Sequence, residues 1–138
     1  MSRMDRQIGR LRKRREFLAA ARGRKRAEAG LVLQARPRSD DAPPRIGFTV
    51  TRKVGSSVIR NRAKRRLRAA AAEILPLAAK AGYDYVLIGR QATLTRRWPD
   101  LLNDLHSALG AVHGNRAGAS RAASDTSASR SGKDVPNG

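Results

Sequence analysis

The chain has 138 residues, with 30 lysines and arginines against 11 acidic residues, giving a formal net charge of +19. It contains no cysteine, which excludes disulfide bonds and thiolate metal sites. No stretch approaches the roughly 20 apolar residues of a membrane span, and the basic N-terminus lacks the apolar segment of a secretory signal. We therefore expect a cytoplasmic protein with a polyanionic partner, nucleic acid before any other.

The first third of the chain predicts a helix and then a strand. Residues 1–10 are polar and basic, and we expect them to be flexible. Residues 11–21 have a helix-forming composition that stops before a glycine. Residues 31–35 are apolar and lie between a glycine and a proline, which favours a strand. Alternation separates the face of Leu31, Leu33 and Ala35 from the face of Val32 and Gln34.

Two more apolar strands are expected on either side of a long helix. The proline-rich residues 36–45 predict a loop joining two antiparallel strands, the second of which is residues 46–51. Alternation puts Ile46, Phe48 and Val50 on one face of it and Gly47, Thr49 and Thr51 on the other. The helix covers residues 58–75, where Pro76 should kink or end it. Residues 83–88 form the next strand.

A final helix is expected from near Pro99, a residue suited to a first helical position. Residues 114–138 contain almost no large apolar side chains and should be disordered. We therefore expect one small α+β domain over residues 11–113. In it, a mixed or antiparallel four-stranded sheet packs with three helices in the order α-β-β-β-α-β-α.

Residues 58–75 form the most informative segment. At about 100° per residue, the apolar side chains fall within an arc of roughly 80° that can pack on a sheet. This seam consists of Ile59, Ala63, Leu67, Ala70 and Ile74. Near the opposite direction lie Asn61, Lys64, Arg65 and Arg68, and the flanks hold Arg60, Arg62 and Arg66.

Such a face suits phosphates, because a guanidinium can bond two phosphate oxygens at once and a lysine adds a mobile charge. The alternative is a solvated charged face. Against it, the run has one sign and continues upstream through Arg52 and Lys53. It also includes Asn61, whose amide can bond bases or sugar edges.

The segment RIGFTVTRKVG at residues 45–55, followed by RNRAKRRLR at residues 60–68, closely resembles the signature of the bacterial ribonuclease P protein family. The resemblance covers about residues 11–113. It implies a left-handed β-α-β crossover and a role in removing the 5′ leader from precursor tRNA. It further implies that the catalytic subunit is RNA, that Mg²⁺ held mainly by this RNA performs the hydrolysis, and that no protein partner is obligatory.

The resemblance also assigns two sets of binding residues. The set facing the catalytic RNA comprises Arg52, Lys53, Arg60, Asn61, Arg62, Lys64, Arg65 and Arg68. A cleft between the first helix and the sheet would hold the leader of precursor tRNA, and its lining comprises Phe17, Val32, Gln34 and Thr49. Family members commonly have a second aromatic one helical turn after the first, where this chain has Ala20 or Ala21. Gln34 likewise stands where an aromatic is frequent.

No catalytic or metal-binding constellation is found in the sequence. His106 and His113 suit neither a zinc pair nor the paired histidines of a metal-free ribonuclease. Two rival functions stay open from the residues alone. One is a structural RNA-binding protein, and the other a DNA-binding protein that uses residues 58–75 as a recognition helix. Against the latter, a strand precedes this helix in place of a helix-turn-helix.

Overall fold

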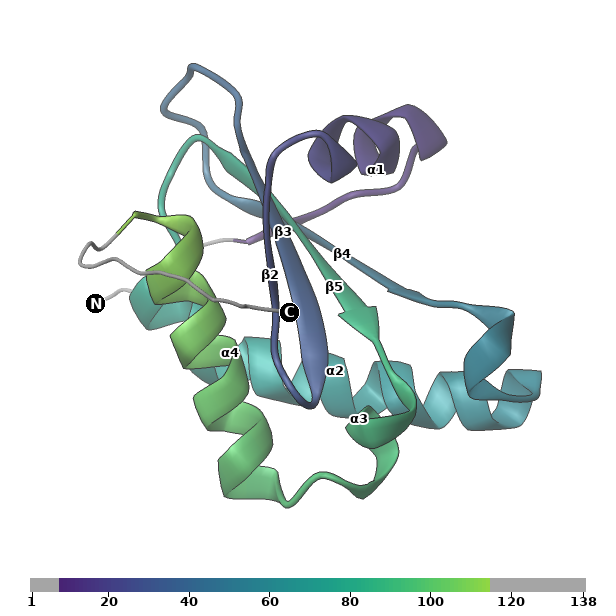
Figure 1. Cartoon of the computed structure of the whole chain (residues 1–138). Coiled ribbons are helices and arrows are strands. Elements are labelled where there is room, and N and C mark those ends of the chain that lie inside the picture. Colours follow the sequence, from purple (N-terminus) through teal and green to yellow (C-terminus); the bar gives the residue numbers. More distant parts are fainter. Residues whose placement is uncertain (1–7, 115–138) are drawn as a thin grey trace.

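One mixed sheet is the centre of the computed structural model, which describes residues 8–114 (Figure 1). Within these residues the strand order is β1-β4-β5-β3-β2. β4 runs parallel to β1 and β5, whereas β3 runs antiparallel to β5 and β2. The strands are β1 (Gly9–Arg10), β2 (Arg24–Ala27), β3 (Leu31–Pro37), β4 (Arg45–Val50) and β5 (Tyr83–Gly89).

The helices divide unequally between the two faces of the sheet. α1 (Arg14–Ala21) lies on one face, and α2 (Ser57–Ala78) and α4 (Trp98–Val112) cover the other (Figure 1). A 3-10 turn, η1 (Arg52–Val54), leads into α2, and the short α3 (Gln91–Thr95) precedes α4. α2 connects the parallel neighbours β4 and β5, so β4-α2-β5 is the crossover unit of the fold.

The main core lies between the sheet and the helices α2 and α4. Leu31, Leu33 and Ala35 of β3 are buried there, while Val32 and Gln34 are half-buried, as alternation predicts. A smaller cluster under α1 contains Leu11, Ala20 and Val86, with Phe17 and Ile88 packed against it.

The expected α+β class is confirmed, and the order α-β-β-β-α-β-α holds from α1 to α4 apart from the added α3. The described sheet has one strand more than expected, because residues 9 and 10 of the segment expected to be flexible pair with β4 as β1. The loop expected over residues 36–45 does join two strands that run antiparallel, β3 and β4, but β5 lies between them in the sheet. Apart from Gly114, the expected disordered tail lies outside the described residues.

The sequence predicts a kink or an end of α2 at Pro76, and the structure shows that the helix does not end there. The helix continues to Ala78, with Pro76 inside its last turn. Proline has no backbone N–H, so Pro76 removes one intrahelical donor. The preceding Leu75 is buried in the core, and its carbonyl accepts from the backbone N–H of Ala79 at 2.8 Å. Core packing therefore carries the helix past the proline.

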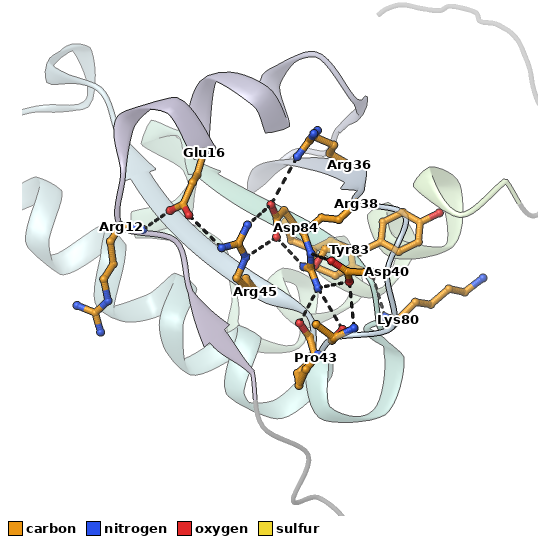
Figure 2. A network of polar contacts seen from close by, with 12 residues as sticks. Arg12, Glu16, Arg36, Arg38, Asp40, Pro43, Arg45, Lys80, Tyr83 and Asp84 are labelled. Carbon is orange, nitrogen blue, oxygen red and sulfur yellow. Dashed lines mark hydrogen bonds and ion pairs between the residues drawn. The ribbon is translucent and has the colours of Figure 1, made fainter.

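A polar network fixes α1 over the sheet (Figure 2). The Glu16 carboxylate accepts from the backbone N–H groups of Arg12 and Lys13, each at 2.9 Å, and from Arg45 Nη1 at 2.9 Å. The backbone donors of Lys13 and Arg12, and then the Arg45 guanidinium, lower the pKa of Glu16 to about 2. A carboxylate that caps the helix start is thereby tied to β4.

Asp84 of β5 is the centre of this network and is 1% exposed. Arg45 makes a two-pronged contact with it, with both nitrogen–oxygen distances 2.8 Å, and Arg38 Nη1 donates at 2.8 Å. Burial alone would raise the pKa of Asp84, but the hydrogen bonds from Arg45 and Arg38 lower it below its usual range. Arg38 also donates to Asp40 and to the carbonyls of Tyr83, Ala42 and Pro43.

Candidate RNA-binding surface

The basic helix begins at a constrained turn. Gly55 has φ 155°, a conformation that side-chain-bearing residues rarely adopt, and a Cβ there would lie 2.9 Å from Ile59 Cγ2. Ser56 then caps α2, since its Oγ accepts from the backbone N–H of Ile59 at 3.4 Å. This turn fixes where the first basic residues of the helix emerge from the sheet.

The helix buries one stripe and exposes its arginines, as the wheel predicts. Ala63, Leu67 and Ala70 are fully buried, and Ile59 and Ile74 are half-buried. The most exposed members of the expected set are Arg52 and Lys53 in η1 and Asn61, Arg62, Arg65 and Arg68 on α2. We call these six residues the α2 basic face. Lys64 borders it and is half-buried.

Arg60 belongs partly to the turn that precedes the helix. Its side chain is half-buried, and Nε donates to the Gly55 carbonyl at 3.2 Å. One end of this guanidinium therefore stabilises the turn, which leaves the terminal nitrogens for a ligand.

Arg66 is a structural residue. Its Nη1 donates to the carbonyls of Thr93 and Leu94 at 2.7 and 3.0 Å, and Nη2 donates to the carbonyl of Arg96 at 2.7 Å. Its guanidinium carbon also lies 5.8 Å from the centre of the Trp98 ring. Arg66 thus ties α2 to α3 and to Arg96 just after it, and three of its five N–H donors are bonded within the protein.

We expect Arg66→Ala to lower the free energy of unfolding by about 2 kcal/mol, because three carbonyls lose a charged donor. Binding of RNA below the unfolding temperature should change little. Arg65→Ala is the matched control: the neighbouring exposed arginine should show the reverse pattern. Chemical denaturation and filter binding of both variants measure the two effects. Equal losses of RNA affinity in the two variants would contradict this division of roles.

The four residues expected to line the leader cleft lie together on the α1 face of the sheet. One row across the strands consists of Ala27, Val32, Ile88 and Thr49, and the next of Lys25, Gln34, Val86 and Gly47. Val32, Gln34 and Thr49 are half-buried, so α1 covers this face incompletely. We call the two rows the α1-side face. Sequence reasoning missed Lys25, which stands at its exposed edge beside Gln34.

Phe17 closes one side of this face. A Cβ on Gly47 would lie 2.6 Å from Phe17 Cε2, so the glycine makes room for the ring. The ring packs against the cluster of Leu11, Ala20 and Val86 but is only half-buried. Phe17 therefore combines a packing role with an accessible part. Ala20 is fully buried and cannot replace a second stacking aromatic.

The acidic and histidine side chains do not assemble into a catalytic or metal site within residues 8–114, where no group of three or more metal-ligating residues gathers. Asp84 and Asp104 are paired with arginines. His113 Nε2 is hydrogen-bonded to Tyr85 Oη at 2.7 Å, whereas His106 is exposed. Burial, and then the charges of Lys80 and Arg24, lower the pKa of His113 to about 4. No helix among these residues is long and apolar enough to cross a membrane.

Comparison with known proteins agrees with this geometry. The model of a family described as Ribonuclease P matches residues 6–113. A ribonuclease P protein component of Caulobacter vibrioides is 52% identical over 101 residues, which cover 72% of this chain and 68% of that protein. The protein of the same name from Paramagnetospirillum magneticum is 52% identical over 114 residues, covering 79% and 86% of the two chains.

Solved structures show the same fold. The RNase P protein from Thermotoga maritima superposes with a TM-score of 0.64 at 29% identity, covering 76% of this chain and 98% of that one. The RNase P protein of Staphylococcus aureus gives a TM-score of 0.61 at 25% identity, with coverage of 74% and 93%.

Proposed function

This chain belongs to the bacterial ribonuclease P protein family, which acts in the processing of tRNA 5′ ends, and we propose that it binds two RNAs on opposite sides of its sheet. The α2 basic face binds the ribonuclease P RNA. The α1-side face holds the single-stranded 5′ leader of precursor tRNA. By bringing the two RNAs together, the cytoplasmic protein promotes endonucleolytic removal of the leader.

The proposal rests on the contrast between the two faces of α2. The face toward the sheet consists of small and aliphatic side chains packed in the core. The opposite face exposes the side chains of Arg62, Arg65 and Arg68 to solvent. No hydrogen bond or ion pair within the described residues occupies these three guanidiniums. A partner with closely spaced phosphates would use them and would relieve their mutual repulsion.

The leader site rests on the shape and chemistry of the α1-side face. Its half-buried Val32, Ile88 and Thr49 offer a largely apolar surface beside the accessible part of the Phe17 ring. An aromatic side chain can stack on bases without reading their sequence, at about 1–3 kcal/mol per base. Ala20 or Ala21 stands where a second helix aromatic is common, and Gln34 stands at a strand position where an aromatic is frequent, so polar contacts supply more of the binding in this chain.

We place the hydrolysis in the RNA subunit. In support, no group of three or more carboxylates and histidines that could hold a metal ion gathers among residues 8–114, and the buried carboxylates there already face arginines. As the family resemblance implies, we assign the metal ions that would supply the hydrolytic chemistry mainly to the RNA. The contribution of the protein is to position the substrate and to neutralise phosphate charge.

Phe17→Leu tests the leader site. We expect the reconstituted enzyme to lose about five- to tenfold in affinity for precursor tRNA, because one stacking contact is removed. Its affinity for mature tRNA, which has no leader, should stay the same. Gel-shift titrations with both tRNAs measure the ratio. Leu18→Ala, an exposed neighbour on α1, is the control for a general effect on the helix. An unchanged preference for precursor in Phe17→Leu would make Phe17 a packing residue only.

A further inference from the structure

Phe48 of β4 lies on the other side of the sheet from Phe17. It alternates with Gly47 and Thr49, which face α1, and its ring packs against the main core on the α2 side. The ring is nevertheless only half-buried. This position is close to the sheet edge, since β1 is the last strand beyond β4.

Two arginines from different elements approach this ring. The guanidinium carbon of Arg10, on β1, lies 5.3 Å from the ring centre, and that of Arg68, on α2, lies 6.0 Å from it. Both distances are within the range of cation–π attraction. The register explains the first contact: Arg10 pairs with Ile46, which shares its strand face with Phe48.

Both guanidiniums keep their hydrogen-bond donors free. Arg10 and Arg68 are exposed, and neither makes a hydrogen bond or an ion pair among residues 8–114. Arg45 on β4 and Arg38 in the loop after β3 differ, because Arg45 donates to Asp84, and Arg38 donates to Asp84 and to carbonyls. A ring that attracts a cation restrains its side chain without supplying an oxygen acceptor.

We propose that Arg10 and Arg68, held by Phe48, form a phosphate-binding pair that extends the α2 basic face around the sheet edge to β1. The partner is the sugar–phosphate backbone of the ribonuclease P RNA, because the pair lies on the α2 side and not on the α1-side face. This inference rests on the proposed function. Arg10 and Arg68 bind phosphate, and Phe48 is a positioning residue that reduces the freedom each side chain loses on binding.

Arg10→Ala should weaken binding to the ribonuclease P RNA about five- to tenfold at moderate salt. The plot of log affinity against log salt concentration should become shallower by about 0.7–0.9, the loss expected for one phosphate contact. Arg97→Ala, another exposed arginine, located before α4, is the charge-matched control and should leave the slope unchanged. Wild-type affinity and slope in Arg10→Ala would overturn the proposal.

The role of Phe48 is tested by a mutant cycle. Phe48→Leu keeps an apolar side chain in the core and removes the ring, so RNA affinity should fall about two- to threefold, while Phe48→Tyr should retain it. In an Arg10→Ala/Arg68→Ala background, Phe48→Leu should cause no further loss. A loss that persists in this background would show that Phe48 acts through packing alone, which would overturn its positioning role.

The same titrations separate this inference from the function on which it rests. If Arg62→Ala/Arg65→Ala weakens RNA binding while Arg10→Ala does not, the pair is refuted and the α2 basic face stands. If neither variant weakens binding, the assignment of the α2 basic face fails, and the extension fails with it.

Discussion

Replacing Arg62, Arg65 and Arg68 together with alanine is expected to weaken binding of the ribonuclease P RNA roughly 100-fold at moderate salt. Each exposed guanidinium offers several donors to phosphate, and the loss of three contacts should also make the salt dependence shallower by about two to three. The free energy of unfolding should change little, because all three side chains lie outside the core. Filter binding over a range of salt concentrations measures both quantities.

The control removes the same charge elsewhere. Arg22, Lys80 and Arg97 are exposed on three other parts of the surface, so their triple alanine variant has the same net charge as the first. A local contact surface predicts that this control keeps most of its RNA affinity. Equal losses in the two triple variants would mean that total charge, and not the α2 basic face, determines binding.

Asp84→Asn is expected to lower the free energy of unfolding by roughly 3 kcal/mol, with a fall in melting temperature on the order of 15 °C. The carboxylate is 1% exposed and accepts from both Arg45 and Arg38. An amide of the same shape would turn an N–H group toward these donors and remove the buried negative charge that pairs with both guanidiniums. Calorimetry or thermal circular dichroism measures the change.

Asp40 provides a control within the same network. It pairs with the same Arg38 but about half of its side chain is exposed, so Asp40→Asn should cost much less stability than Asp84→Asn. A cost as large as that of Asp84→Asn would contradict the importance of burial.

The stability difference between wild type and Asp84→Asn should depend on pH. The pKa of Asp84 is lowered on folding, so its stabilising effect is complete above the ordinary carboxyl pKa near 4 and is lost as the pH falls below that value. Glu16, whose pKa is lowered to about 2, is present in both proteins, so its protonation in acid destabilises both and does not add to the difference. The two melting temperatures should therefore converge in acid and stay apart at neutral pH.

Elements with a buried face could be predicted from the sequence. The alternation in β3 and β4 and the apolar seam of α2 each indicate which side chains are buried, and the burial seen in the structure agrees with them. The sequence of β2 shows no alternation of apolar and polar residues, because all four of its residues are exposed. The strand is held in place by its pairing with β3. The short β1 depends in the same way on pairing with β4.

Part of the candidate surface could be predicted from the sequence. The wheel and the family signature identify the arginines of α2, but they cannot separate Arg66 from Arg65, since the carbonyls that bind Arg66 come from residues 93–96. Asp84 left a usable signal: an acidic residue within an apolar strand requires a buried partner. The sequence gives no signal for the Arg10–Phe48–Arg68 arrangement, because its three residues come from elements distant in the chain.

The most direct test of the account is cleavage of a 5′-labelled precursor tRNA at low magnesium concentration. Three reactions are compared: the protein alone, a bacterial ribonuclease P RNA alone, and the two together. The account predicts release of the leader at the mature 5′ end only when both are present. Cleavage by the protein alone would contradict the assignment of hydrolysis to the RNA, and tight RNA binding without any gain in cleavage would contradict the proposed role of the chain.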